Sequence, residues 1–165
     1  MKNNYPLFFI IFSIITFLSF SNDGYSKLIN VPDEYSNIQA ALNSAAEGDS
    51  VQVAPGIYNE NIVWPNLNGI KLMGSGEDSC QIKGVSDEAV LIIGNANGND
   101  ITINSETEIS GFTISNGKNG GVRCFHSSPY LSNLIIQENL CGIYCYHSSP
   151  TLFNIKIIDN YIYNG

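Results

Sequence analysis

Three patterns of apolar and polar residues follow one another along this chain of 165 residues. Residues 7–20 are almost wholly apolar, and residues 37–46 place apolar side chains at helical spacing. From Asp49 onward, short apolar runs are separated by clusters of Asn, Gly, Ser and Asp. Short runs bounded by turn residues are typical of β-strands. The pattern predicts an all-β domain with one short helix at its front.

The helix is predicted over residues 37–46. Its apolar side chains recur at the spacing of one helical face: Ile38, Ala41, Leu42 and Ala45. Ser36 as N-cap and Gln39 three positions later match a capping box, and Gly48 is a stop signal. This helix is expected to cover the front end of the β domain.

An internal repeat is the strongest signal in the sequence. Segments 121–141 and 142–162 align without a gap and share the pattern Gly-x-x-Cys-x-His-Ser-Ser-Pro. A short fixed period is typical of a solenoid, in which each repeat buries its apolar face against its neighbours. An antiparallel sandwich would not require the repeat, whereas a parallel β-helix does, because each coil places like residues over like. We therefore expect a parallel β-helix with coils of about 21–22 residues.

Alternation within each coil assigns side chains to the inside or the outside of the solenoid. In the first copy, Val122 and Cys124 are predicted to point inward, and Arg123 and Phe125 outward. The second copy repeats this assignment, with Ile143, Cys145, Leu152, Ile155 and Ile157 inside and Tyr144, Tyr146 and Lys156 outside. Two pairs of Asn fall at turns, where stacked amides can hydrogen-bond from coil to coil: Asn133 with Asn154, and Asn139 with Asn160.

The segment 1–26 has the layout of a secretory signal peptide. The alternative is a membrane anchor, but the apolar run over positions 7–20 is shorter than the roughly 20 residues needed to cross a bilayer. We expect a secreted protein, extracellular or at the cell surface, with the periplasm as an alternative, and no membrane span after cleavage. Residues 27–165 form one domain, and it is predicted to be C-terminally incomplete because the chain stops as a third copy starts.

The net charge of the chain limits the classes of molecule that it is expected to bind. The net charge is −8, which repels nucleic acid and anionic lipid and argues against an uncovered site for polyuronate. Arg123 is the lone Arg and is interpreted as a surface residue, since its repeat partner is Tyr144.

Residues 31–60 begin with Val-Pro-Asp-Glu-Tyr-Ser-Asn-Ile-Gln-Ala-Ala-Leu and end with Gly-Asp-Ser-Val-Gln-Val-Ala-Pro-Gly-Ile-Tyr-Asn-Glu. This segment resembles the opening of pectin-lyase-like β-helix proteins. The Gly-Ile-Tyr-Cys-Tyr-His-Ser-Ser-Pro copies resemble repeats of secreted bacterial β-helix proteins. The resemblance implies a right-handed parallel β-helix. It implies no single activity, because this superfamily includes lyases, hydrolases, esterases, epimerases and adhesins.

Two pairs of stacked residues are weak metal candidates. His126 and His147 occupy equivalent positions of the two copies and could hold Zn²⁺ or Cu²⁺, but they lack a third ligand. Glu138 and Asp159 are equivalent in the same way, and stacked carboxylates suit Ca²⁺. Turn positions explain both pairs more simply, so we expect no cofactor, with Ca²⁺ as the alternative. Cys124 and Cys145 share a repeat position and are interpreted as a ladder of thiols, with a disulfide as the alternative.

Outward aromatic residues are the best candidates for binding. Phe125, Tyr144 and Tyr146 would form a flat stripe on a rigid sheet, suited to stacking on sugar rings. No complete catalytic set is found. The first hypothesis is a secreted, structural or adhesive β-helix module that contacts polysaccharide or cell-surface glycan. The alternative is the N-terminal part of a polysaccharide-degrading enzyme whose active site lies beyond this chain.

Overall fold

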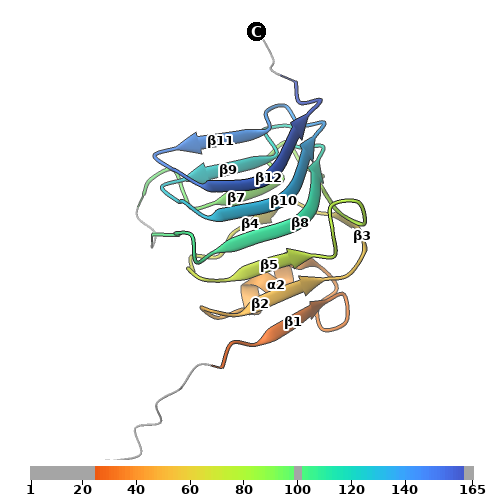
Figure 1. Ribbon diagram of the computed structural model, residues 1–165, viewed down its shortest axis with the longest axis vertical. Coiled ribbons are helices and arrows are strands. Elements are labelled where there is room, and N and C mark those ends of the chain that lie inside the picture. The colour runs from red at the N-terminus through yellow and green to blue at the C-terminus, as the bar shows by residue number, and fades with distance from the viewer. Residues whose placement is uncertain (1–24, 99–101, 162–165) are drawn as a thin grey trace, which may run out of the picture.

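The computed structural model describes residues 25–98 and 102–161, which wind into a single parallel β-solenoid (Figure 1). Residues 1–24 and 162–165 lie outside the described residues, so the signal peptide and the start of a third repeat copy stay predictions. The elements are β1 (Leu28–Val31), α2 (Ile38–Ser44), β2 (Ser50–Val53), β3 (Gly56–Asn59), β4 (Ile62–Val63), β5 (Lys71–Gly74), β6 (Cys80–Lys83), β7 (Leu91–Ile93), β8 (Glu108–Ser115), β9 (Val122–Phe125), β10 (Tyr130–Gln137), β11 (Ile143–Tyr146) and β12 (Thr151–Ile158). No helix among them is long and apolar enough to cross a membrane.

The strands form two sheets. One sheet of eight strands, here called sheet A, runs in the order β1-β2-β5-β8-β10-β12, with β3 and β6 beside that path. The other, sheet B, has four strands in the order β11-β9-β7-β4. The pairings between these strands are parallel, which confirms a parallel β-helix and excludes an antiparallel sandwich.

The repeat sets the register of the last coils. Leu131 pairs with Leu152 between β10 and β12, and Cys124 pairs with Cys145 between β9 and β11. Like residues therefore stack over like. The inward residues of the first copy are fully buried: Val122, Cys124, Leu131, Leu134 and Ile136. Burying an aliphatic side chain of this kind stabilises the fold by roughly 1.5–3 kcal/mol.

A left-handed backbone bend recurs at equivalent points of successive coils. Gly111, Asn133 and Asn154 occupy one such position, with φ of 76°, 50° and 51°. Gly and Asn adopt this conformation at low cost, so each of these long strands can turn without ending its pairing. The predicted Asn ladder is confirmed, because the side-chain amide of Asn154 donates to Oδ1 of Asn133 at 2.8 Å.

Helix α2 covers the front of the core, as predicted, and Ile38, Ala41 and Leu42 are buried. The capping box predicted for Ser36 and Gln39 is wrong. Asn37 is the N-cap, because its extended backbone lets Oδ1 accept from the Ala40 amide at 2.8 Å. Gln39 instead exchanges hydrogen bonds with the backbone of Val63, which ties α2 to β4. The helix also ends earlier than predicted, at Ser44.

The second repeat copy differs from the first in burial. Its inward positions follow the predicted alternation, yet Leu152 is 48% and Ile157 is 49% exposed. These side chains are exposed because β11 and β12 are the last strands of their sheets among the described residues. Their inner side chains contact the preceding coil on one side only.

Candidate functional site

The outer face of sheet B gathers the predicted aromatic residues. Strand pairing places Tyr144 directly over Arg123, and Tyr146 directly over Phe125. Because Val122 and Cys124 point into the core, Arg123 and Phe125 must point out from the same strand. The four side chains therefore form one array, here called the aromatic face.

The rings of the aromatic face lie close together. The Phe125 ring centroid is 6.0 Å from that of Tyr144 and 6.3 Å from that of Tyr146, with interplanar angles of 54° and 56°. Tilted rings at these distances attract each other. Tyr144 and Tyr146 are 41% and 42% exposed, so much of their ring surface faces solvent. The structure thus brings together all three residues that the sequence singled out.

Arg123 belongs to this array, and the sequence interpretation of Arg123 as a surface residue did not include its stacking on two rings. Its guanidinium carbon lies 4.7 Å from the Tyr144 ring centroid and 4.9 Å from that of Phe125. Its Nε is buried without a hydrogen-bond partner. None of the ion pairs formed by the described residues involves Arg123. Two rings therefore hold a cation that forms no ion pair with the described residues.

The signal for this arrangement was present in the repeat. The repeat offset places the lone Arg against Tyr144, and both residues are on the outward side of their strands. Toward the front of the solenoid the same row continues with Ile92 and then Val63, which is 56% exposed. An apolar strip thus leads to the aromatic face along sheet B.

His126 and His147 stack as predicted, with ring centroids 4.9 Å apart and an interplanar angle of 16°. Tyr146 meets both rings near their edges. Each imidazole nitrogen binds a metal in its own ring plane, and nearly parallel planes do not converge on one ion. Across residues 25–98 and 102–161, no three His, Cys, Asp or Glu side chains are grouped for a metal. The geometry favours a ladder at the turn.

Glu138 and Asp159 also lie at equivalent bends, with φ of 56° and 50°. The backbone amide of Glu138 donates to the carbonyl of Asp159 at 3.1 Å, so the two turns are stacked. Both side chains are exposed. The two residues thus meet as the sequence predicted, and Ca²⁺ binding by them stays a prediction.

The four cysteines are free thiols. Cys124 and Cys145 are direct neighbours, as the thiol-ladder interpretation requires. Burial, together with the nearby Cys145, raises the pKa of Cys124 to about 12. This thiol is therefore protonated at neutral pH and is a poor nucleophile or metal ligand.

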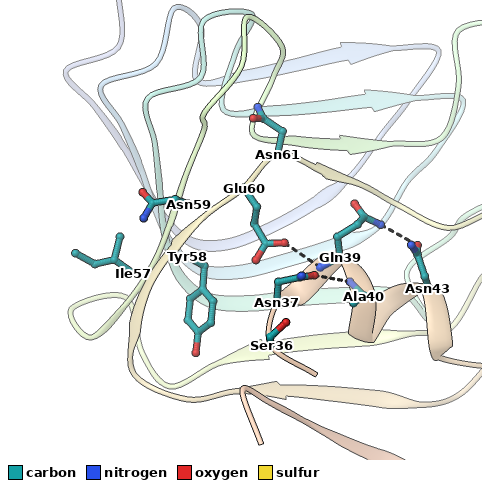
Figure 2. A pocket seen from close by; sticks show the side chains of 10 residues that line it. All are labelled: Ser36, Asn37, Gln39, Ala40, Asn43, Ile57, Tyr58, Asn59, Glu60 and Asn61. Atoms are coloured by element: carbon teal, nitrogen blue, oxygen red, sulfur yellow. Dashed lines mark hydrogen bonds between the residues drawn. The ribbon is translucent and has the colours of Figure 1, made fainter. Parts of the chain in front are cut away.

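A hollow of about 640 Å³ lies between α2 and β3 (Figure 2). Its polar side chains serve mainly to join the helix to the first coil. The Glu60 carboxylate accepts from the amides of Ile38 and Gln39 at 2.9 and 3.0 Å. The Gln39 side chain donates to Asn43 at 2.9 Å. Because these groups already have partners, the hollow is explained by the attachment of α2.

No family model matches the sequence, and no curated protein matches it. Among solved structures, the chain is similar to the pectin methylesterase PemA from Erwinia chrysanthemi, with a TM-score of 0.52 and 15% identity. The match covers 73% of this chain and 45% of PemA, so the chain spans less than half of the length of that enzyme. A mutant pectin methylesterase in complex with a hexasaccharide matches with a TM-score of 0.49 and 15% identity, over 73% of this chain and 49% of the other. The fold expected from the resemblance is confirmed: the chain has the right-handed parallel β-helix fold seen in pectin methylesterase.

Proposed function

We propose that this protein is a secreted β-helix module that binds polysaccharide through the aromatic face, in a structural or adhesive role. The observation that carries the proposal is the array on sheet B, where Tyr144 and Tyr146 are 41% and 42% exposed beside Phe125. Exposed, pre-positioned rings can stack on the apolar faces of sugar rings with little loss of conformational entropy.

Arg123 supports this proposal by supplying polar recognition within the same array. Its guanidinium donors are held against two rings and form no ion pair with the described residues. A sugar stacked on Tyr144 would place hydroxyl or carboxylate oxygens beside these donors. Carbohydrate sites combine such flat apolar surface with a few directed polar groups.

The geometry of the parallel sheet favours the binding of a long polymer. Backbone pairing fixes the positions of β9 and β11, so the aromatic face is rigid. Val63 and Ile92 extend the apolar row along the solenoid axis. A chain of sugars lying along this row would contact several coils at once, which favours polysaccharide over a single sugar.

The test is affinity electrophoresis of the purified protein through gels that contain methylesterified pectin, de-esterified pectin, a neutral β-glucan or a neutral mannan. We expect at least one polymer to retard the protein. Tyr144→Ala with Tyr146→Ala should abolish the retardation, whereas Tyr161→Ala, which removes a 68% exposed Tyr that belongs to no strand of sheet B, should leave it unchanged. Equal mobility of the wild type in every gel would refute the proposal.

The alternative is the N-terminal part of a polysaccharide-acting enzyme. It is favoured by one observation, the match of this chain to 45% of PemA. Because the active site of this alternative would lie beyond the chain, product release from pectin by the full-length gene product, as methanol or as unsaturated or reducing sugar ends, would select it over a binding module.

A further inference from the structure

Charged side chains border the aromatic face along one edge of sheet B. This edge consists of three turns that lead into β7, β9 and β11, over residues 84–90, 116–121 and 138–142. Backbone hydrogen bonds stack these turns on one another. The Asn119 amide donates to the carbonyl of Glu88 at 3.4 Å, and the Leu140 amide donates to the carbonyl of Gly117 at 2.9 Å. The charges of successive turns are therefore held in a row, here called the acidic edge.

Unpaired carboxylates outnumber unpaired cations on the acidic edge. Lys118 is neutralised by Asp87, because its Nζ lies 2.7 Å from Oδ1 of that residue. Glu88 and Glu138 are exposed, and neither belongs to an ion pair formed by the described residues. Asp159, which follows β12 at the position equivalent to Glu138, forms no such ion pair either. The acidic edge and its continuation thus present three uncompensated negative charges.

The acidic edge lies close to the aromatic face. Gly120 is part of the second turn, and a Cβ added to it would be 3.7 Å from Cγ of Arg123. Arg123 follows Gly120 by three positions, which is about 10 Å along an extended strand. The Debye length in about 0.1 M salt is also roughly 10 Å. A polymer stacked beside Arg123 therefore lies within the electrostatic range of the edge.

Arg123 does not reverse the sign of this charge. It is one cation beside three uncompensated carboxylates, and its guanidinium is held 4.7 Å from the Tyr144 ring centroid and 4.9 Å from that of Phe125. A polyuronate carries a carboxylate on every sugar, so one carboxylate can meet Arg123 while its neighbours face the acidic edge. An uncharged chain can form the same stacking contacts, and its hydroxyls can accept from Arg123, without this repulsion.

We propose that the polysaccharide bound by the aromatic face is uncharged, and that the acidic edge excludes polyuronates. Polysaccharide binding by the aromatic face, the proposed function, is the premise of this selectivity. The net charge of −8 acts in the same direction over longer distances, and the fold places part of it beside the face. The class of ligand is therefore a polymer of neutral sugars, or a uronan whose carboxylates are esterified.

The test compares polymers that differ in charge on the same backbone. Affinity electrophoresis is run with methylesterified and de-esterified pectin, and with a neutral β-glucan and its carboxymethyl derivative. Tyr144→Ala with Tyr146→Ala, which has the wild-type net charge, gives the reference mobility in each gel. At about 10 mM salt we expect the uncharged member of a pair to bind at least about tenfold more tightly than the charged member. At about 0.3 M salt this preference should shrink, since the Debye length falls below about 8 Å.

The outcomes separate this selectivity from polysaccharide binding itself. Equal or tighter binding of the charged member at low salt would overturn the selectivity and leave polysaccharide binding standing. If no polymer retarded the wild type relative to the reference variant, the proposed function would fall, and the selectivity with it.

Charge-removing variants test whether the acidic edge is the cause. Glu88→Gln with Glu138→Gln keeps the size of both side chains and removes two charges from the edge. Glu47→Gln with Glu108→Gln is the matched control, because it removes two unpaired charges beside β2 and β8 of sheet A. We expect the first double variant to tighten binding of the de-esterified or carboxymethyl polymer about threefold at low salt, and to leave binding of the uncharged polymer unchanged. An equal effect of the control would assign the preference to net charge alone and overturn the role of the acidic edge.

Discussion

Asn139 donates from its side-chain amide to Oδ1 of Asn160 in the next coil, with 3.0 Å between the two atoms. The same amide also donates to the carbonyls of Ile114 and Gln137, while Oδ1 accepts from the amide of Gly117. Asn139 is 1% exposed. One buried side chain thus satisfies backbone groups of its own coil and of the preceding coil, and it also bonds to the Asn160 side chain of the next coil.

Asn139→Ala should therefore be among the most destabilising substitutions in the turns. It leaves several buried backbone groups without partners, each costing about 1–3 kcal/mol, and we expect a total loss of about 3 kcal/mol in the free energy of unfolding. Urea denaturation measures this loss. Asn119→Ala, at an exposed turn residue, is the control and should change stability by less than about 0.5 kcal/mol. Equal effects of the two substitutions would contradict the role given to Asn139.

The close approach of two coils at Gly74 and Gly111 predicts that a substitution there will lower the stability of the fold. A Cβ added to Gly74 would overlap the carbonyl oxygen of Gly111, whereas a Cβ added to Gly56 would be 3.5 Å from its nearest neighbour, on the Tyr58 ring. Gly74→Ala must push two coils apart, and overpacking of this kind costs about 1–3 kcal/mol. Thermal unfolding should show a clear fall in Tm for Gly74→Ala and little change for Gly56→Ala. A Tm for Gly74→Ala equal to that of the wild type would show that the coils separate freely.

The repeat explains why so much of the fold could be predicted from the sequence. Parallel stacking requires like residues over like, so the repeat offset alone predicts the pairing of Cys124 with Cys145 and of Leu131 with Leu152. Hydrophobic alternation then assigned the faces. This is how Phe125, Tyr144 and Tyr146 could be placed on one surface.

Features that depend on long-range contacts could not be predicted in this way. Glu60 caps the amides of Ile38 and Gln39 from a distant part of the sequence, and this contact replaces the local capping box. Exposure of Leu152 and Ile157 depends on which coil comes next rather than on their own pattern. The stacking of Arg123 on two rings required the directions of three side chains, which periodicity alone does not give.

Burial of Cys124 predicts a dependence of stability on alkaline pH. Folding raises the pKa of this thiol from 9.0 to about 12. The unfolded chain therefore loses the proton first, and the contribution to stability, fully present below pH 9, is lost as pH rises toward about 12. At pH 10, the loss from this one group is on the order of 1 kcal/mol.

Urea denaturation of wild type and Cys124→Ala at about pH 8 and pH 10 isolates this effect, because the Tyr and Lys residues titrate in both proteins. The wild type should lose more stability than Cys124→Ala between the two pH values. Val122→Ala, a packing change in the same strand, should retain the wild-type pH dependence. Parallel losses in wild type and Cys124→Ala would show that the thiol ionises equally well in the folded state.

Substitutions of Arg123 are expected to affect polysaccharide binding and the free energy of unfolding to different extents. Stacking on two rings contributes about 0.5–1 kcal/mol for each ring, whereas leaving Nε buried without an acceptor costs about 1–3 kcal/mol. Arg123→Met keeps apolar contact with Phe125 and Tyr144 and removes the unpaired donor. Its free energy of unfolding should therefore stay within about 1 kcal/mol of the wild-type value.

Polysaccharide binding should respond to Arg123 differently from stability. Arg123→Met removes all directed donors, so retardation by the polymer that binds the wild type should fall strongly. Arg123→Lys keeps the charge but loses the planar group that stacks and forms paired hydrogen bonds, and it should bind at an intermediate level. If Arg123→Met lowered the free energy of unfolding by more than about 2 kcal/mol and left retardation unchanged, Arg123 would be a packing residue, because loss of a structural contact reduces stability without removing a sugar-binding donor.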